Sequence, residues 1–512
     1  MKTKITLLCY ACITSLFSVL KAQAAPKPDE KKPNIILLMT DQQRFDCLGI
    51  IGNGAIKTPN MDALARDGLL FLNGYSSTPS STPARAALLT GMAPWHNGLL
   101  GYGDIAEHYN FEMPQMLRDN GYYTYAVGKL HYAPQRNLHG YEGASLDESG
   151  RVQTLGFVSD YRQWFLKVAP GLNPDSTGIG WNEHTGKVYA LDEKFHPTTW
   201  TANEAIRFID EYNSERPFFL TVSFARPHSP YDPPQRFFEE YENVTLPVPY
   251  IGDWCQNFAS KSETKNAAFG NFGEKHTLES RRFYYASISF IDEKIGQIIV
   301  ELKKRGMYEN SLIVFVSDHG DMLGDHYHWR KTYAYEGSSH IPFIVKFPEN
   351  KKGDCPKGTK MEQPVELRDI LPTFLDVTGI PIPSEIDGRS IYSLYKNKNA
   401  EWRTYIDLEH TASYDENGYW AALTDGEMKY IYFFPTGEEQ LFDISINKGE
   451  LHNLATDPEY RQTLEIWRTR MIRHLKERGE PYVKKGKLQI IKKGILYGPK
   501  YPGPVKPSGK IQ

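Results

Sequence analysis

Residues 34–42 read NIILLMTDQ, an almost unbroken apolar run followed by an acid and an amide. Short apolar runs bounded by polar residues are typical of parallel strands that are buried on both faces of a sheet. Residues 311–319 repeat the pattern as SLIVFVSDH. The sequence therefore predicts two inner strands of a parallel sheet, and each is followed by side chains that can bind a cation.

Further strands and helices are predicted around these two runs. Apolar runs at residues 123–127, 218–224 and 341–347 predict additional strands. Thr58-Pro59 is a typical helix start and Gly68 a typical end, and residues 279–305 form a second helical pattern with an apolar face. Strands that alternate with helices predict an α/β fold, with a mostly parallel sheet flanked by helices.

The pattern changes after about residue 395. Residues 420–443 alternate apolar and polar side chains around Asp425-Gly426, which predicts a hairpin. Asp457-Pro458 then begins a helix that runs to about Glu477. We therefore expect a main α/β domain over residues 33–395, a smaller α+β subdomain with an antiparallel sheet over 396–483, and an extended tail over 484–512.

The N-terminus resembles a signal peptide over residues 1–24. Lys2 and Lys4 precede an apolar stretch at residues 5–20, and Ala22-Gln23-Ala24 is a small-x-small cleavage pattern. The apolar stretch is too short for a confident membrane span, and no later segment approaches one. The sequence predicts an exported protein, periplasmic or secreted, without a transmembrane segment.

Charge and cysteine content exclude two further classes. The formal charge is -3, and about -6 once the three lysines of the signal peptide are removed. This balance argues against general nucleic-acid binding, which favours a basic face. The remaining cysteines, Cys47, Cys255 and Cys355, are too few and odd in number for a disulfide framework.

The side chains that follow the two inner strands form a candidate metal site. Asp41-Gln42 and Asp318-His319 stand at the carboxyl ends of their strands, where sites form in parallel α/β sheets. Two carboxylates, an amide and an imidazole suit a divalent cation such as Ca²⁺, with Mn²⁺ or Mg²⁺ also possible. For either pair alone, the alternative is an aspartate that caps the next turn.

A candidate nucleophile lies at the start of a predicted helix. The sequence from Ser81 is STPARAALLTG, in which Pro83 suits a helix start and Gly91 a helix end. Ser81 would then lie at the positive helix N-terminus, where an anion is favoured. Taken alone, an ordinary helix-capping serine explains this motif equally well.

Ser81-x-Pro-x-Arg85 with Thr90-Gly91 closely resembles the signature of the type I, formylglycine-dependent sulfatases of the alkaline phosphatase superfamily. Further motifs resemble the family's in order from about Pro33 to Arg478: residues 58–68, 121–131, 227–230, 317–320, Lys331 and 440–454. The resemblance implies an alkaline-phosphatase-like fold and a sulfuric ester hydrolase, here a serine-type bacterial member.

The resemblance also implies the cofactors. Ser81 would be oxidised to formylglycine by a separate maturation enzyme of the anaerobic type, and its hydrate would attack sulfur. The metal ligands implied are Asp41, Gln42, Ser81, Asp318 and His319. A plain serine could not release the sulfate afterwards, which is the chemical reason for the modification.

Each remaining site residue has a role implied by its match to the family. Arg85 would stabilise the ionised hydroxyl. Lys129 and Lys331 would bind the sulfate oxygens. His131 would assist sulfate release, and His228 would protonate the leaving alcohol. Any of these residues taken singly has an ordinary structural explanation as well.

The substrate is left open by the sequence. Loops over residues 133–198 and 247–277 predict walls of a substrate site, and a sulfated carbohydrate such as a glycosaminoglycan, mucin or algal glycan fits an exported bacterial enzyme. Candidates for contacting the sugar are Trp95, His96, Asp104, His184 and Arg330.

Three other functions also stay open. Gln42 stands where many family members have aspartate, and resembles the branch with choline sulfatases and phosphonate monoester hydrolases. The first alternative is therefore a phosphonate monoester or phosphodiester hydrolase of the same superfamily. The second uses unmodified Ser81 for phosphoryl transfer, and the third is a carbohydrate-binding or scaffold protein without activity.

Overall fold

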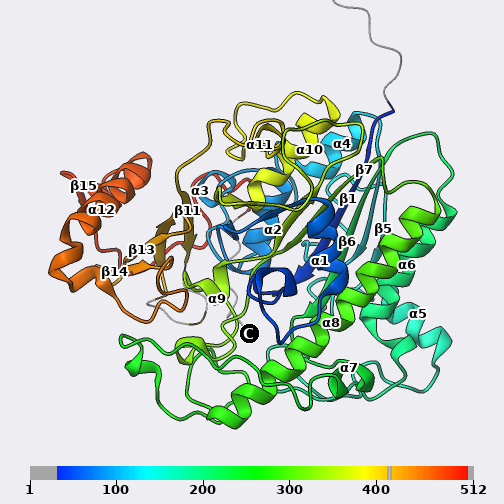
Figure 1. Ribbon diagram of the computed structural model, residues 1–512, viewed down its shortest axis with the longest axis horizontal. Helices are drawn as coiled ribbons and strands as arrows, with labels where there is room; N and C mark the ends of the chain where they lie inside the picture. The colour runs from blue at the N-terminus through cyan, green and yellow to red at the C-terminus, as the bar shows by residue number, and fades with distance from the viewer. Residues whose placement is uncertain (1–30, 412–413, 415–417, 505–512) are drawn as a thin grey trace, which may run out of the picture. The chain divides into compact units, whose positions relative to one another are not determined.

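In the computed structural model, β1 (Asn34–Asp41) is an inner strand of an eight-stranded sheet. It pairs in parallel with β6 (Phe218–Pro227) on one side and β7 (Ser311–Ser317) on the other. Figure 1 labels β1 near its neighbours β6 and β7. The strand order is β5-β4-β6-β1-β7-β8-β2-β9. The other strands are β4 (Tyr123–Gly128), β5 (Gly143–Leu146), β8 (Phe343–Lys346), β2 (Leu69–Phe71) and β9 (Thr359–Met361).

The structure describes residues 31–411, 414 and 418–504. The predicted signal peptide, residues 1–24, lies outside the described residues. Residues Pro33–Gln512 make up one compact unit, so the boundary that we place after residue 395 remains a prediction about organisation within it. The predicted α/β class is confirmed, and every strand predicted from an apolar run belongs to the large sheet.

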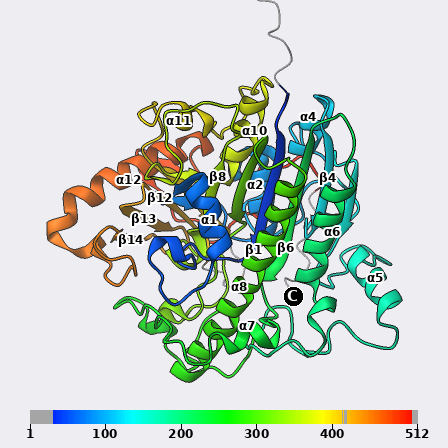
Figure 2. The same cartoon turned by 45° about the vertical axis from the view of Figure 1, so that its right-hand side comes forward.

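One face of the sheet is covered by α1 (Pro59–Asp67), α6 (Pro197–Glu211) and α8 (Glu274–Lys304) (Figure 2). Ile36 and Leu38 of β1 pack into this core and are fully buried. The first predicted helix is confirmed within a residue at each end. The helix predicted over 279–305 begins earlier, at Glu274, because Gly273 takes a positive φ there and starts the helix.

The opposite face is covered by α2 (Ser81–Thr90), α4 (Met113–Asp119) and α10 (Ile370–Thr378). Ile35 and Met39 of β1 pack into this second core. Because successive side chains of a strand point to opposite faces, β1 must be apolar at every position to serve both cores. This requirement explains the unbroken apolar run in the sequence.

A four-stranded antiparallel sheet follows near the C-terminus, with the order β11-β12-β13-β14. The predicted hairpin is confirmed, since Thr424 of β12 pairs with Lys429 of β13 around Asp425-Gly426. The strands are β11 (Ile406–His410), β12 (Trp420–Thr424), β13 (Met428–Phe433) and β14 (Glu438–Asp443). α12 (Arg461–Leu475) packs on this sheet through Trp467 and Met471.

The described part of the tail returns to the main body of the molecule. Leu100 donates its backbone N–H to the carbonyl of Leu496 at 3.0 Å, and the Tyr501 hydroxyl donates to the carbonyl of Asp104 at 2.9 Å. Gly98 has a φ of +83°, and a Cβ there would lie 2.2 Å from the Tyr501 nitrogen. Only glycine therefore allows the tail to approach this closely.

The shorter elements complete the chain. They are β3 (Gly74–Tyr75), α3 (Pro94–Asn97), α5 (Asp160–Val168), α7 (Gln235–Glu239), α9 (Glu336–Ser339), β10 (Val365–Glu366), α11 (Tyr392–Lys396), β15 (Val483–Lys484) and β16 (Lys487–Leu488). Cys47, Cys255 and Cys355 are buried and free. Within the described ranges, no helix has both the length and the apolar character needed to cross a bilayer.

Candidate active site

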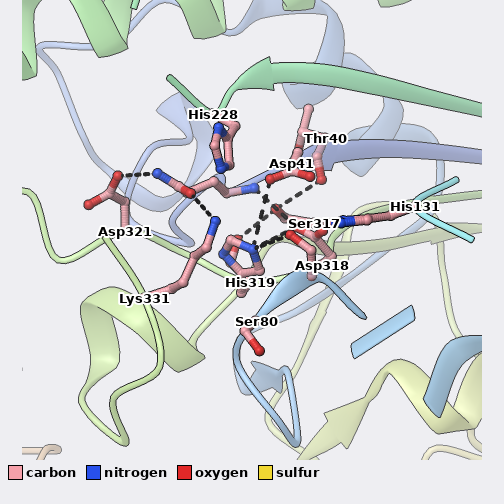
Figure 3. A network of polar contacts seen from close by, with 12 residues as sticks. Thr40, Asp41, Ser80, His131, His228, Ser317, Asp318, His319, Asp321 and Lys331 are labelled. Carbon is pink, nitrogen blue, oxygen red and sulfur yellow. Dashed lines mark hydrogen bonds and ion pairs between the residues drawn. The ribbon is translucent and has the colours of Figure 1, made fainter. Parts of the chain in front are cut away.

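The carboxyl ends of β1 and β7 place two carboxylates side by side. Thr40 pairs with Ser317 in the parallel register, so Asp41 and Asp318 leave the sheet at the same edge. The ligand atoms of Asp41, Asp318 and His319 all lie within 4.8 Å of one another, and the three side chains are buried. Figure 3 shows them converging at the centre of a polar network. We refer to these three residues as the acidic triad.

The acidic triad fits a divalent cation. Asp41 Oδ1 is buried and has no hydrogen-bond partner among the described residues, and it lies 3.8 Å from His319 Nε2. His319 Nδ1 lies 2.9 Å from the carbonyl oxygen of Gly320, which can only accept, so Nδ1 carries the proton and Nε2 presents a lone pair. Burial lowers the pKa of His319 to about 4, so the ring is neutral at pH 7, as a ligand must be.

Gln42 lies beside the acidic triad, but its amide is bound elsewhere. Its Oε1 accepts a hydrogen bond from Lys331 Nζ at 2.8 Å, and its Nε2 donates to Asp321. The residue has a φ of +77°, which turns its side chain out of the line of β1. In this structure the Gln42 amide links Lys331 to the site. A role for Gln42 as a metal ligand stays a prediction.

Ser81 is the first residue of α2, as predicted, and Ser80 precedes it in extended conformation. Ser81 Oγ lies 3.1 Å from His319 Nε2, so the positive N-terminus of the helix points at the acidic triad. Ser80 Oγ instead lies 2.8 Å from Nε2 of His410 on β11. Of the two neighbouring serines, Ser81 is therefore the one that contacts the triad.

Two cations neutralise the buried carboxylates. Arg85 donates to Asp318 Oδ2 at 3.1 Å and to Asp41 Oδ2 at 3.3 Å, and Lys129 Nζ also pairs with Asp41. Burial by itself would raise the pKa of Asp41, but the surrounding basic groups together hold it well below its ordinary value. These groups are Lys129, His228, His319 and Lys331. Asp41 is therefore ionised across the physiological pH range.

Lys129 and Lys331 are themselves shifted toward neutrality. Burial, together with the positive charge of Arg151, lowers the pKa of Lys129 to about 8 against the opposing effect of Asp41. Burial likewise lowers the pKa of Lys331 to about 7, against the opposing effect of Asp41. An anion bound between these two amines would favour their charged forms.

Two histidines aim unpartnered ring nitrogens into the same space (Figure 3). His228 Nδ1 lies 2.9 Å from the carbonyl of Ser229, while its Nε2 is buried without a partner among the described residues. His131 Nε2 lies 3.3 Å from the hydroxyl of Tyr102, and its Nδ1 is likewise unpartnered. Burial lowers the pKa of both rings well below the ordinary value, so both are neutral at pH 7.

A cavity of about 520 Å³ opens beside this site. Lys331 reaches it from the site itself, and the two long predicted loops supply much of its wall. The described residues that line it are Ser80, Tyr102, Arg151, Gly180, Trp181, Asn182, Glu183, Lys265, Asn266, Lys331, Thr332 and Tyr414. The prediction that residues 133–198 and 247–277 wall the site agrees with this arrangement.

The comparison with known families identifies the chain. A model of the sulfatase family matches residues 33–380, and a model described as N-sulphoglucosamine sulphohydrolase, C-terminal, matches residues 324–477. The chain belongs to the sulfatase family. It is accordingly a hydrolase of sulfuric esters, with the fold of the alkaline phosphatase superfamily.

Relatives of this sulfatase span most of its length. It is 38% identical to an arylsulfatase of Clostridium perfringens, over 89% of this chain and 97% of that protein. It is 32% identical to a choline-sulfatase of Rhizobium meliloti, over 83% of each chain. An N-acetylglucosamine-6-O-sulfatase of Bacteroides thetaiotaomicron is 26% identical, over 85% of this chain and 84% of that protein.

Solved structures share the fold. The phosphonate monoester hydrolase of Agrobacterium radiobacter superimposes with a TM-score of 0.75 at 23% identity, over 88% of this chain and 98% of that one. A protein solved with D-glucosamine-2-N,6-O-disulfate as its substrate gives a TM-score of 0.71 at 22% identity, over 87% of this chain and 98% of that one.

The structure brings together every residue that the sequence proposed for the site. None of the five sugar-contact candidates is among the described residues that line the cavity, although Arg330 stacks on Tyr414, which does line it. Trp95, for example, packs in the C-terminal core, and the guanidinium carbon of Arg478 lies 4.5 Å from the centre of its ring. His96 pairs with Asp387 and Glu477.

The residues that the sequence did not reveal lie in loops and have no local motif. Arg151 belongs to the long loop over residues 133–198, and Tyr102 lies between α3 and α4. Tyr102 and Arg151 lie in the cavity wall, and Glu148 accepts the backbone N–H groups of Leu130 and His131. A sequence signal existed only for Asp321, the last residue of the Asp318-His-Gly-Asp segment, which binds Gln42.

Proposed function

We propose that this sulfatase is exported and hydrolyses sulfate esters of a carbohydrate through formylglycine at position 81. The observation that carries the proposal is the position of Ser81 Oγ, at the N-terminus of α2 and 3.1 Å from His319 of the acidic triad. The family of the chain supports the modification. The N-acetylglucosamine-6-O-sulfatase and the ulvan-active sulfatase among its relatives support a carbohydrate substrate.

The acidic triad, with Gln42 and residue 81, would hold the metal, which we propose to be Ca²⁺. Oxygen ligands dominate this set and Ca²⁺ prefers them, although Mn²⁺ and Mg²⁺ accept similar ligands. A divalent cation here supplies positive charge that favours ionisation of a neighbouring hydroxyl and stabilises sulfate oxygens. Formylglycine at position 81 would supply, as its hydrate, one hydroxyl to attack sulfur and a second to lose its proton as sulfate leaves.

The chain's own side chains would position the ester and move its protons. Lys129 and Lys331 would hold sulfate oxygens, because both are buried amines whose charged form an anion favours. Arg85, fixed by Asp41 and Asp318, would hold the ionised hydroxyl.

Two histidines would divide the proton transfers. His228 presents an unpartnered Nε2. A sulfate ester bound beside it would favour the protonated ring, whose Nε2 proton would then pass to the leaving alcohol, with Lys331 as a second source. His131 presents its unpartnered Nδ1 and would take the proton of the second hydroxyl as sulfate leaves. The hydroxyl of Tyr102 would keep that ring oriented.

The test of this proposal is maturation followed by turnover. The protein co-expressed with an anaerobic maturation enzyme should show a mass at residue 81 lower by two hydrogens, or the mass of the hydrate. It should hydrolyse 4-nitrophenyl sulfate only in that form and with a divalent cation. Full activity with unmodified Ser81 would contradict the proposal. Periplasmic or extracellular recovery from the native bacterium would test export.

A phosphonate monoester hydrolase is the alternative, because Gln42 leaves the predicted ligand set one carboxylate short. The ratio of kcat/KM for 4-nitrophenyl sulfate and for a phenylphosphonate monoester decides between the two. A ratio above one supports the sulfatase, and a ratio well below one supports the alternative.

A further inference from the structure

Arg151 stands in the cavity wall as a cation without a partner. Its Nη1 atom is buried and makes no hydrogen bond, and none of the described carboxylates pairs with its guanidinium. A partly buried cation loses hydration, and that loss is not offset unless an anion replaces the water. The position of Arg151 therefore indicates a site for an anion that enters from outside.

The loop holds Arg151 firmly in place. Its backbone N–H donates to the carbonyl of Glu148 at 3.0 Å, and its carbonyl accepts from Gln135 Nε2 at 2.9 Å. Gln135 is fully buried, and its Oε1 accepts from the backbone of Gln153 and Thr154, both at 3.1 Å. The turn is thus set before any ligand binds.

The same turn is tied to the active site. The carboxylate of Glu148 accepts the backbone N–H groups of Leu130 and His131 at 2.9 and 3.0 Å. The positive charge of Arg151 also contributes to lowering the pKa of Lys129, after burial, so the two cations lie within electrostatic reach of each other. Arg151 is therefore held in a defined place relative to the sulfate-binding residues.

Arg151 lines the cavity together with Lys331, which the proposed function assigns to the scissile sulfate, whereas Lys129 lies deeper. Lys129 is fully buried against Asp41 and does not line the cavity, whereas Arg151, Lys265 and Lys331 all do. Glu183 is the acidic residue among the described lining residues. The described wall of the cavity therefore carries more positive than negative charge, and two of its cations, Arg151 and Lys265, have no role in the proposed cleavage.

We propose that Arg151 binds a second anionic group of the substrate, a carboxylate or a second sulfate carried near the scissile ester. This inference rests on the proposed function and narrows its substrate class to glycans with two anionic groups. A guanidinium binds either anion through two parallel N–H groups, so both belong to one ligand chemistry. Lys265, on the facing loop, supplies additional positive charge to the same cavity.

Binding is best measured without turnover, on the full chain with Ser81→Ala and Ca²⁺. The probes for calorimetry are N-acetylglucosamine 6-sulfate with one anion, glucosamine 2-N,6-O-disulfate with two sulfates, and a disaccharide of glucuronate and N-acetylglucosamine 6-sulfate. With Arg151 intact, the probes with two anions should bind about 10- to 100-fold more tightly than the first, as expected for a charged hydrogen-bonded pair. Which of the two binds more tightly identifies the anion.

Arg151→Gln should remove most of this preference and change the affinity for the probe with one anion by less than about threefold. Arg151→Lys should keep part of the preference for probes with two anions, because the positive charge remains. Lys187→Gln is the matched control, since Lys187 carries the same charge in the same long loop but its side chain is exposed and does not line the cavity. That variant should bind all three probes as the parent does.

Three results would overturn the inference: equal affinity for one and two anions with Arg151 intact, an Arg151→Gln variant that keeps the preference, or one that weakens all probes equally. The last result would mean that Arg151 serves the scissile sulfate itself. Failure of the matured wild type to cleave any sulfate ester would instead overturn the proposed function, and the binding comparison would still decide the role of Arg151.

Discussion

Replacing Arg85 with alanine should destabilise this sulfatase much more without calcium than with it. The Arg85 guanidinium donates to Asp318 at 3.1 Å and to Asp41 at 3.3 Å, and both carboxylates are fully buried. Removing one partner of a buried ion pair costs about 3–5 kcal/mol. Lys129 still pairs with Asp41 in the variant, so we expect a loss near the lower end, about 3 kcal/mol, in calcium-free buffer.

A cation bound by the same two carboxylates would replace much of the missing charge. The variant should therefore bind calcium about tenfold more tightly than the wild type, which returns about 1.4 kcal/mol of stability at saturating calcium. The difference in unfolding free energy between the two proteins should shrink from about 3 to about 1.5 kcal/mol.

Urea unfolding followed by tryptophan fluorescence, with a chelator and with saturating Ca²⁺, measures both differences. Arg478→Ala is the matched control, because Arg478 makes an equally buried pair with Glu409, at 2.7 and 2.8 Å, outside the acidic triad. Its stability loss should be the same with and without calcium. If Arg85→Ala behaves in that way too, the carboxylates that Arg85 neutralises do not bind the ion.

Three further predictions concern the nucleophile, a site lysine and a distant carboxylate. In protein co-expressed with the maturation enzyme, Ser81→Ala should lower kcat by about 10⁴- to 10⁶-fold. The control variant Ser80→Ala should retain activity. Comparable losses in both variants would contradict the assignment of Ser81. If Lys331 must be charged to hold sulfate, kcat/KM should fall above about pH 7, which is the pKa of Lys331 in the folded protein. Lys331→Arg should move that fall to higher pH. An unchanged pH profile in this variant would exclude the role. Burial raises the pKa of Asp292 to about 6, above its value of about 4 in the unfolded chain. Between these two pH values the folded state binds more protons than the unfolded state. The free energy of unfolding should therefore decline by about 2–3 kcal/mol as pH rises from 4 to 7. Asp292→Ala should flatten this decline in pH-dependent urea unfolding, and a parallel curve would show that another group causes it.

The elements that sequence predicted well are those set by local patterns. β1 and β7 are recognisable because strands buried on both faces must be apolar throughout. α2 is recognisable because Pro83 favours its first turn and Gly91 takes a φ of +67° at its end. The acidic triad followed from these elements, since residues after neighbouring parallel strands meet at one edge.

Features set by distant contacts were not predictable in the same way. The apolar run at residues 341–347 predicts a strand but not its direction, and β8 proved antiparallel to β7. Arg151 lies in a loop without periodicity, and its place depends on Gln135 and Glu148. Trp95 illustrates the opposite error, because an aromatic side chain that suits sugar stacking suits a hydrophobic core equally well.

The return of the tail to residues 98–104 has a consequence for the order in which the enzyme becomes complete. A nascent chain that ends near residue 484 already carries Ser81, the acidic triad and both site lysines, yet it lacks the segment at Leu496–Tyr501 that braces the stretch around Tyr102. Tyr102 in turn contacts His131 and forms part of the cavity wall. Residues 496–501 must therefore be synthesised before the substrate cavity has its finished shape.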